Sequence, residues 1–242
     1  MKFSEKQGAL FMNSAKSGDE RLIAEITKII REIIDERSGK PAQIIDNAPL
    51  GEKSAANAHA APAAHSPDPR DVTIAVGPAF LSALTMTLSG LPHADILREI
   101  AAGVEEEGMI PRVVKVFKTS DAAFIGKEAA ELSGSGVGVG LQSKGTAVIH
   151  QKDLYPLTNL ELFPQAPLMT LAHYRGIGRN AARYAKGERV KPLKVLNDPM
   201  TRAAYQVKAA LMHNKETALV DTGRASEELT WQETEARGHV FI

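Results

Sequence analysis

The chain has 242 residues, with 29 Lys plus Arg against 29 Asp plus Glu, so its formal net charge is zero. This balance lacks the basic excess that nucleic-acid-binding surfaces normally carry. The absence of Cys excludes a disulfide framework, a thiol nucleophile and a Cys-ligated metal centre. No apolar run approaches the roughly 20 residues that span a bilayer, and the polar start is unlike a secretory signal. We therefore expect a soluble, cytosolic protein that binds neither nucleic acid nor membranes.

The first predicted element is an amphipathic helix in an N-terminal extension, residues 1–37. Leu and Ile residues between positions 22 and 34 recur at spacings of three and four, and charged residues fill the opposite face. Residues 38–70 have no such period, are rich in Ala and Pro, and are predicted to be a flexible linker. The apolar face of this tethered helix must therefore be buried against another surface. The helix either self-associates or docks as an address peptide on another assembly.

Residues 71–220 are predicted to form an α/β domain, followed by a polar tail at 221–242 that we expect to be peripheral or partly disordered. Short β-branched runs alternate with segments of helical period, which is typical of a Rossmann-like unit on a parallel sheet. Additional C-terminal helices follow this unit. In chain order, the expected elements are strand 72–76, helix 94–107, strand 112–117, helix 121–132, strand 137–142, helix 166–186 and helix 201–213.

Polar side chains follow two of the predicted strands. Ligands of open parallel sheets bind beyond the carboxyl ends of the strands. There the sequence has Lys118-Thr-Ser-Asp121 after the second strand and Ser143-Lys-Gly-Thr146 after the third. An acid, a base and several hydroxyls thus share one rim. The alternative is purely structural: Ser120 and Asp121 cap the next helix, and Lys144 is a solvated loop residue.

Glycine alternates with other residues at positions 134, 136, 138 and 140. Because alternate residues of a strand point to one face, this run leaves one face without side chains. Either the backbone of a helix or a planar cofactor could approach that face. The phosphate motifs GxGxxG and the P-loop are both broken here, by Val139 and Ser143, so nucleotide binding through them is disfavoured.

The sequence offers no catalytic or metal-ligating set. The seven His residues are scattered, and no Ser–His–Asp combination follows from the spacing. The acidic run Glu105–Glu107 is expected to be a solvated face. The basic stripe Arg175, Arg179 and Arg183, near Lys186, is either solvated or faces a phosphate or an acidic partner. These patterns favour a binding subunit over a self-sufficient catalyst.

A series of sequence blocks comes in the order of a known family. Over about residues 71–217 the chain resembles the medium (β) subunit of adenosylcobalamin-dependent propanediol and glycerol dehydratases. The blocks include Val76-Gly-Pro-Ala-Phe80, Ala102-Gly-Val-Glu-Glu-Glu-Gly108, Thr119-Ser-Asp121, Gln142-Ser-Lys-Gly-Thr146 and Asn159-Leu-Glu-Leu-Phe-Pro-Gln-Ala-Pro167.

This resemblance implies a lyase complex of three subunit types in two copies each. A large TIM-barrel subunit would hold the substrate and the radical chemistry, beside a small subunit and a separate reactivating factor. The medium subunit would be non-catalytic and cover the lower side of base-on adenosylcobalamin. The complex would convert propane-1,2-diol or glycerol to aldehydes. The N-terminal extension resembles the one that directs diol dehydratases into a bacterial microcompartment in the cytoplasm.

The family's cofactor contacts fall on Asp121 and Lys144, and glycines at 136 and 138 would admit the flat corrin ring. Two other functions remain open: a subunit of the dehydratase-reactivating factor, and a microcompartment scaffold that uses only its peptide helix. The matched blocks imply these further cobalamin-binding residues: Ser143, Thr146, Asn159, Pro164 and Arg202.

Overall fold

The computed structural model describes residues 27, 62–194, 197–232 and 234. The chain divides into two compact units, Met1–Ala58 and His59–Ile242. Apart from Thr27, which is helical, the predicted N-terminal helix lies outside the described residues, as does the linker up to residue 61.

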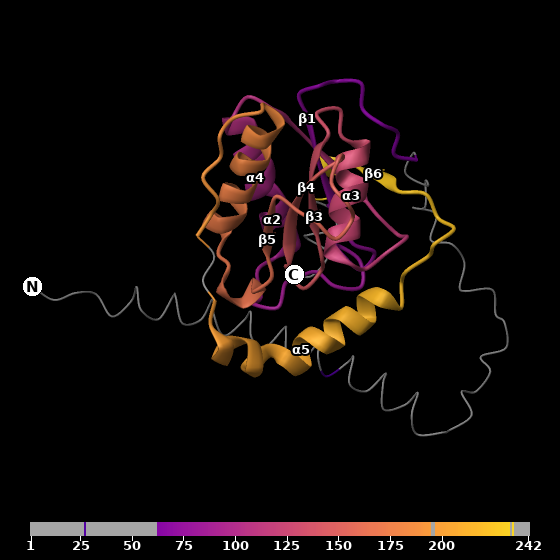
Figure 1. Cartoon of the computed structure of the whole chain (residues 1–242). Helices are drawn as coiled ribbons and strands as arrows, with labels where there is room; N and C mark the ends of the chain where they lie inside the picture. The colour runs from indigo at the N-terminus through magenta and orange to yellow at the C-terminus, as the bar shows by residue number, and fades with distance from the viewer. Residues whose placement is uncertain (1–26, 28–61, 195–196, 233, 235–242) are drawn as a thin grey trace, which may run out of the picture. The chain divides into compact units, whose positions relative to one another are not determined.

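A six-stranded sheet in the order β5-β4-β3-β1-β2-β6 forms the centre of the domain (Figure 1). β1 is parallel to β2 and β3, whereas β4, β5 and β6 are each antiparallel to a neighbour. The prediction of a parallel sheet is therefore right for the three central strands and wrong for the whole sheet, which is mixed. The strands are β1 Asp71–Val76, β2 Ile110–Lys115, β3 Val137–Leu141, β4 Ala147–Gln151, β5 Glu161–Phe163 and β6 Glu227–Leu229.

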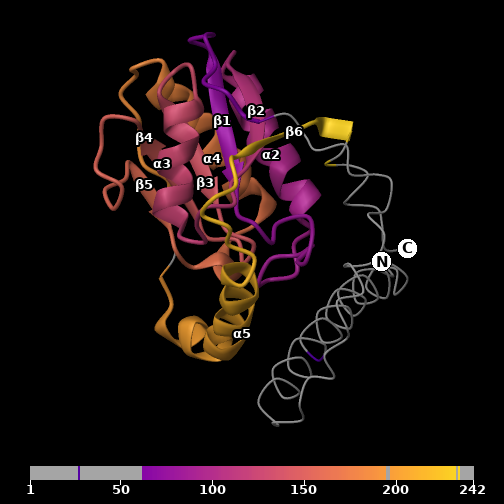
Figure 2. The same cartoon turned by 90° about the vertical axis from the view of Figure 1, so that its right-hand side faces the viewer.

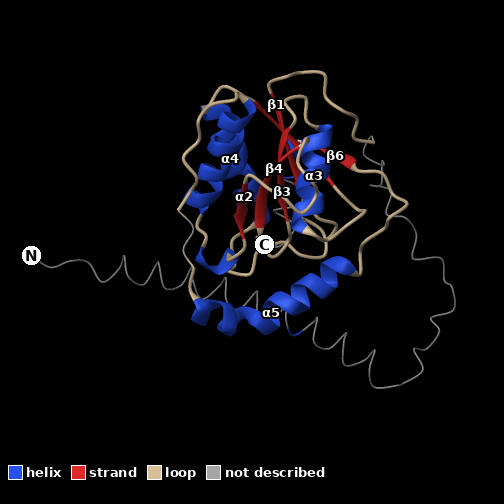
Figure 3. Cartoon of the chain, in the orientation of Figure 1, coloured by secondary structure: helices blue, strands red, loops and turns tan. Residues whose placement is uncertain are grey.

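Helices cover both faces of this sheet (Figure 3). α2 (His93–Glu106) and α4 (Leu171–Ala185) lie on one face, and α3 (Ala122–Leu132) lies on the other. A 3-10 turn, η1 (Ala166–Leu168), takes up the start of the helix predicted at 166–186. None of the helices in the described part of the chain is long and apolar enough to cross a membrane.

The last helix, α5 (Pro199–Thr217), crosses the end of the layers and is longer than predicted (Figures 1 and 2). Asp198 begins it by accepting the Met200 N–H at 2.9 Å, and Pro199 suits the first helical position because it needs no N–H there. Only Met212 and Glu216 of α5 are buried. Most of this helix therefore remains exposed.

The core follows from apolar periodicity. All six residues of β1 are buried, as expected for a central strand covered on both faces. Toward α2 and α4, Val72, Ile74 and Val76 pack with the buried stripe that includes Ile96 and Ile100. Burying each such side chain contributes about 1.5–3 kcal/mol to the stability of the fold.

The bare glycine face of β3 is filled by helix α3. A side chain at Gly138 would place its Cβ 2.6 Å from the carbonyl carbon of Ala129, and one at Gly140 would collide with the backbone of Gly126. The helix-backbone alternative is thus the correct one. Gly136 has a φ of 76° and faces the side chain of Lys152. The structure therefore contradicts the expectation that Gly136 and Gly138 admit a flat cofactor.

Residues 62–70, predicted as the end of the linker, are packed on the domain. The Ala63 N–H donates to Ser226 O at 2.7 Å, and the Ser66 N–H donates to Leu132 O at 2.9 Å. Arg112 donates to Ala64 O at 2.6 Å. The tail likewise contributes β6, which pairs with β2. The ordered domain therefore begins before residue 71 and continues beyond residue 220.

The basic stripe of α4 faces the acidic end of α2. Arg175 contacts Glu106 at 2.6 Å, and Arg183 contacts Glu107 at 2.6 Å. The acidic partner that the stripe allowed thus lies within the same chain, and two residues of the run expected to be solvated are paired. Partly exposed pairs of this kind stabilise a fold by about 0–1 kcal/mol each. They leave these cations engaged and not available for a ligand.

Candidate ligand-binding site at the carboxyl end of the sheet

The candidate site lies where the connections after two adjacent parallel strands diverge. β1 and β3 end side by side, and the Gly77 N–H donates to Leu141 O at 3.0 Å. From β1 the chain continues through α2 to β2, whereas from β3 it turns to β4 on the other side. Open α/β sheets form ligand-binding crevices at such switch points. Helix α5 crosses this edge of the sheet.

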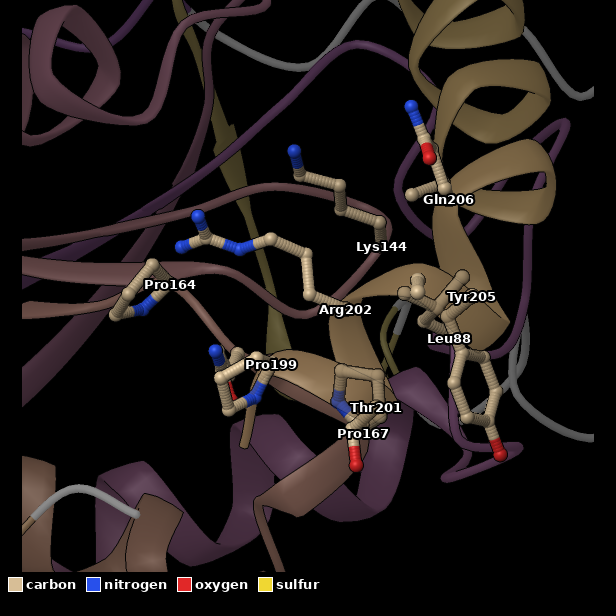
Figure 4. A pocket seen from close by; sticks show the side chains of 12 residues that line it. Leu88, Lys144, Pro164, Pro167, Pro199, Thr201, Arg202, Tyr205 and Gln206 are labelled. Carbon is tan, nitrogen blue, oxygen red and sulfur yellow. The ribbon is translucent and has the colours of Figure 1, made fainter. Parts of the chain in front are cut away.

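A cleft of about 430 Å³ opens between the turn after β3, the segment after β5 and the first half of α5. This volume lies in the usual range for small-molecule sites. Lys144, Pro164 and Arg202, three of the residues expected to bind cofactor, line it. Figure 4 shows the Arg202 guanidinium between the Lys144 side chain and Pro164. The structure therefore brings these three together from distant parts of the sequence.

Neither cation of the cleft forms an ion pair with an acidic side chain of the described residues. Lys144 and Arg202 make no side-chain hydrogen bond or ion pair with any described residue. Burial lowers the pKa of Lys144, while Glu216 and Asp121 act in the opposite direction. A half-buried ammonium without a partner has lost part of its hydration. The cleft is therefore suited to a ligand that presents anionic or strong acceptor oxygens, such as a phosphate.

Ser143, the residue before Lys144, is completely buried and fully engaged within the protein. Its hydroxyl donates to Glu216 Oε1 at 2.7 Å, and its N–H donates to the same oxygen at 3.1 Å. Its carbonyl lies 2.8 Å from Nε2 of His93. Thr146 is also buried and closes the turn, since its carbonyl accepts the Gln142 N–H at 3.0 Å. Ser143 and Thr146, expected as cofactor contacts, thus build the turn and do not line the cleft.

Glu216 is a buried carboxyl group that the sequence patterns did not single out. Burial raises its pKa to about 7, against the hydrogen bonds from Ser143 and the charges of Lys144 and Lys115. A sequence signal for it exists: Met212 and Glu216 are four residues apart, so the acid falls on the short apolar line of α5. An acid in line with apolar helix positions indicates a buried polar contact.

Asp121 caps helix α3, as the structural alternative predicted. Its Oδ1 accepts the N–H groups of Ala123 at 2.8 Å and Phe124 at 3.2 Å. Its side chain is nevertheless near enough to act on the pKa of Lys144. Capping uses only Oδ1 of the carboxylate, so Oδ2 is left for contact with a ligand.

Asn159 lies at the opposite edge of the sheet. β4 pairs antiparallel with β5, Ala147 with Phe163 and Ile149 with Glu161, so the residues just before β5 are far from the cleft end. Asn159 does not line the cleft beside Lys144. Its role in cofactor binding, which the matched blocks imply, stays a prediction.

The donor set of the cleft fits part of a corrinoid. The ammonium of Lys144 and the guanidinium of Arg202 suit a phosphodiester and amide carbonyls, and Leu88 and Pro167 supply apolar walls. The cleft has room for a nucleotide-sized portion only. Within the described ranges, no group of three His, Cys, Asp or Glu side chains is placed to hold a metal ion.

Comparison with known proteins gives a family match and, among the solved structures that are similar, two related to dehydratase reactivation. Residues 77–191 match the family described as dehydratase medium subunit. A glycerol dehydratase reactivase is 22% identical, covers 50% of this chain and 96% of its own, and has a TM-score of 0.42. A diol dehydratase-reactivating factor complexed with ADP and Mg²⁺ is 24% identical, covers 50% and 97%, and has a TM-score of 0.39. Likenesses this distant say nothing of function, whereas the family match confirms the predicted resemblance.

Proposed function

We propose that this chain, which carries a dehydratase medium-subunit domain at residues 77–191, holds the lower, nucleotide-bearing side of adenosylcobalamin in a diol dehydratase complex. The observation that carries the proposal is that Lys144 and Arg202 line one cleft at the switch point of the sheet and that no side chain in the described part of the chain pairs with them. The family match includes Lys144 and ends before Arg202. The assignment of Arg202 therefore depends on the geometry alone.

In this proposal Lys144 binds the phosphate of the cofactor's nucleotide loop, and Arg202 holds the same group or an adjacent amide carbonyl. Charge-assisted hydrogen bonds to a desolvated ammonium are stronger than neutral ones. Pro164, Pro167 and Leu88 exclude water from one side of the loop. When bound, the base-on cofactor supplies the radical chemistry that converts 1,2-diols such as propane-1,2-diol or glycerol to aldehydes.

The proposal makes this chain a binding subunit of a hydro-lyase. A cleft of about 430 Å³ covers only a part of the cofactor, so another chain must enclose the corrin and its reactive side. We assign that role, and the catalytic residues, to a large TIM-barrel subunit, accompanied by a small subunit and served by a reactivating factor. We further propose that the N-terminal segment directs the complex into a bacterial microcompartment.

Replacing Lys144 tests the proposal. In the complex co-expressed with its large and small subunits, Lys144→Ala should weaken cobalamin binding by about 10- to 150-fold, which corresponds to the roughly 1.5–3 kcal/mol of a charge-assisted hydrogen bond. Titration with cyanocobalamin, followed by its visible absorption, measures the dissociation constant.

Lys118→Ala is the matched control. Lys118 lies at the same edge of the sheet, but it is half exposed and paired with Glu128 at 3.0 Å. This variant should bind cobalamin like the wild type. An unchanged dissociation constant for Lys144→Ala in an assembled complex would refute the proposed cofactor site.

A further inference from the structure

The turn that carries Lys144 is held from four sides. His93 of α2 contacts the carbonyl of Ser143 at 2.8 Å, and Glu216 of α5 accepts from the same residue. The Leu88 N–H donates to the carbonyl of Lys144 at 3.0 Å, and the Tyr174 hydroxyl of α4 donates to Gly145 O at 2.8 Å. The backbone of the turn is therefore fixed. The Lys144 side chain is the polar group of this turn that lines the cleft and can bind a ligand.

From this geometry we propose that His93 is a positioning residue, which holds the peptide group between Ser143 and Lys144 so that the lysine faces the cleft. This inference rests on the proposed function, because it assigns a supporting residue to the same cofactor site. His93 does not line the cleft, and we expect it to act only through the turn. It is completely buried at the start of α2.

His93 joins the two connections that diverge at the switch point. Its Nδ1 accepts the N–H of Leu81 at 3.2 Å, in the segment after β1, and its Nε2 reaches Ser143 in the turn after β3. The ring stacks on Phe80 with centroids 3.8 Å apart and an angle of 8° between the planes. Leu81 has a φ of 52°, a conformation that non-glycine residues seldom adopt unless their surroundings hold it. The link thus ends on a residue whose backbone is itself constrained.

The hydrogen bonds determine the state of the ring. Since Leu81 donates to Nδ1, the proton must be on Nε2, where it is donated to the Ser143 carbonyl. A charged ring would turn an N–H toward the N–H of Leu81. Burial lowers the pKa of His93 to about 3, with Lys115 adding to the effect. His93 is therefore a permanent donor near neutral pH and does not act as a switch.

Loss of this donor leaves a buried carbonyl unpaired on the peptide that leads into Lys144. An unpaired buried carbonyl turns toward another donor or toward water, which rotates the peptide group. Such a rotation redirects the lysine side chain, since its Cα belongs to the same peptide unit. The consequence is weaker cofactor binding, although no group that contacts the cofactor has changed.

Two substitutions separate positioning from packing. In His93→Asn the shorter amide can replace Nδ1 toward Leu81 but cannot reach Ser143. In His93→Gln the longer amide can place its nitrogen near the position of Nε2. In the assembled three-subunit complex, we expect His93→Asn to raise the dissociation constant of cyanocobalamin about tenfold, as the loss of one buried hydrogen bond implies. We expect His93→Gln to restore most of the affinity, and kcat at saturating adenosylcobalamin to stay unchanged in both.

A double-mutant cycle with Lys144→Ala completes the test. If His93 acts through Lys144, His93→Asn should cause no further loss of affinity once Lys144 is absent. An equal loss in both backgrounds would overturn the inference, and so would equal loss of affinity in the Asn and Gln variants. Normal binding by His93→Asn beside weak binding by Lys144→Ala would also overturn it and leave the proposed function intact. Normal binding by Lys144→Ala would instead overturn the proposed function.

Discussion

Glu216 should make the stability of this protein depend on pH. Its pKa in the fold is about 7, against an ordinary value of 4.5, chiefly because the carboxyl is buried. A pKa raised by folding means that the fold favours the protonated acid. The corresponding stabilisation is complete below pH 4.5 and is lost as the pH rises toward 7. At roughly 1.4 kcal/mol for each pKa unit, the loss amounts to about 3 kcal/mol.

Glu216→Gln removes this titration while retaining most of the contacts. A glutamine oxygen can accept the N–H of Ser143, and its amide can donate to the Ser143 hydroxyl oxygen. The variant should therefore match the wild type, or be slightly less stable, at pH 5. Toward pH 8 it should gain up to about 3 kcal/mol relative to the wild type, because the latter then carries a buried negative charge.

Urea unfolding of the full chain at pH 5, 6, 7 and 8 measures this difference. Glu105→Gln is the control, since Glu105 is exposed on α2 and its side chain forms no hydrogen bond or ion pair with a described residue. Comparing each variant with the wild type at the same pH cancels the contributions of other titrating groups, such as Asp71, whose pKa is also raised by burial. If the free-energy difference between Glu216→Gln and the wild type is the same at pH 5 and pH 8, the reasoning from the buried carboxyl is wrong.

Two further predictions concern the glycine face and the N-terminal segment. Gly138→Val should prevent stable folding, because its Cβ alone would lie 2.6 Å from the backbone of α3. Gly223→Val is the control and should be tolerated, because this position is exposed and a Cβ there meets ordinary contact distances. Circular dichroism and soluble yield compare the two variants, and a folded Gly138→Val would contradict the close packing. A fluorescent protein fused to residues 1–45 should gather at microcompartment shells in cells that make them. Diffuse fluorescence with shells present would favour self-association of the helix instead.

The central strands and the helices beside them were predictable because their apolar residues follow simple periods. The helix predicted at 94–107 is α2 in the structure, and the strand predicted at 72–76 is β1. β5 and β6 have three residues each, too few for a period, and β6 reads Glu-Glu-Leu. β4 is longer, but its antiparallel direction was not expected, because the alternating strands and helices before it suggest that a parallel sheet continues. Only the short turn at 142–146 indicated a hairpin, because parallel neighbours need a longer connection.

The candidate site was predictable where topology alone determines position. Lys144 follows a central strand, so its place at the carboxyl edge needed only the strand to be recognised. The position of Asn159 depends on the direction of β4, which the sequence patterns did not give. His93 and Glu216 were missed for a different reason: they are 50 and 73 residues from Ser143, and the contacts exist only in the folded chain. The sequence around His93 is that of an ordinary helix start, and the one signal for Glu216 is its place four residues after Met212.

The distribution of charge explains why the rim, and not the more basic helix α4, is the better candidate for an anionic ligand. Arg175 and Arg183 are paired with glutamates of α2, so an incoming phosphate would have to break existing ion pairs. Lys144 has lost part of its hydration without gaining a hydrogen bond or ion pair to a described side chain, so a phosphate restores interactions that folding removed. The buried acid Glu216 accepts hydrogen bonds from the N–H and the hydroxyl of Ser143. Its charge acts on the pKa of Lys144, but among the described residues it forms no ion pair with the lysine, so the ammonium stays available for a ligand.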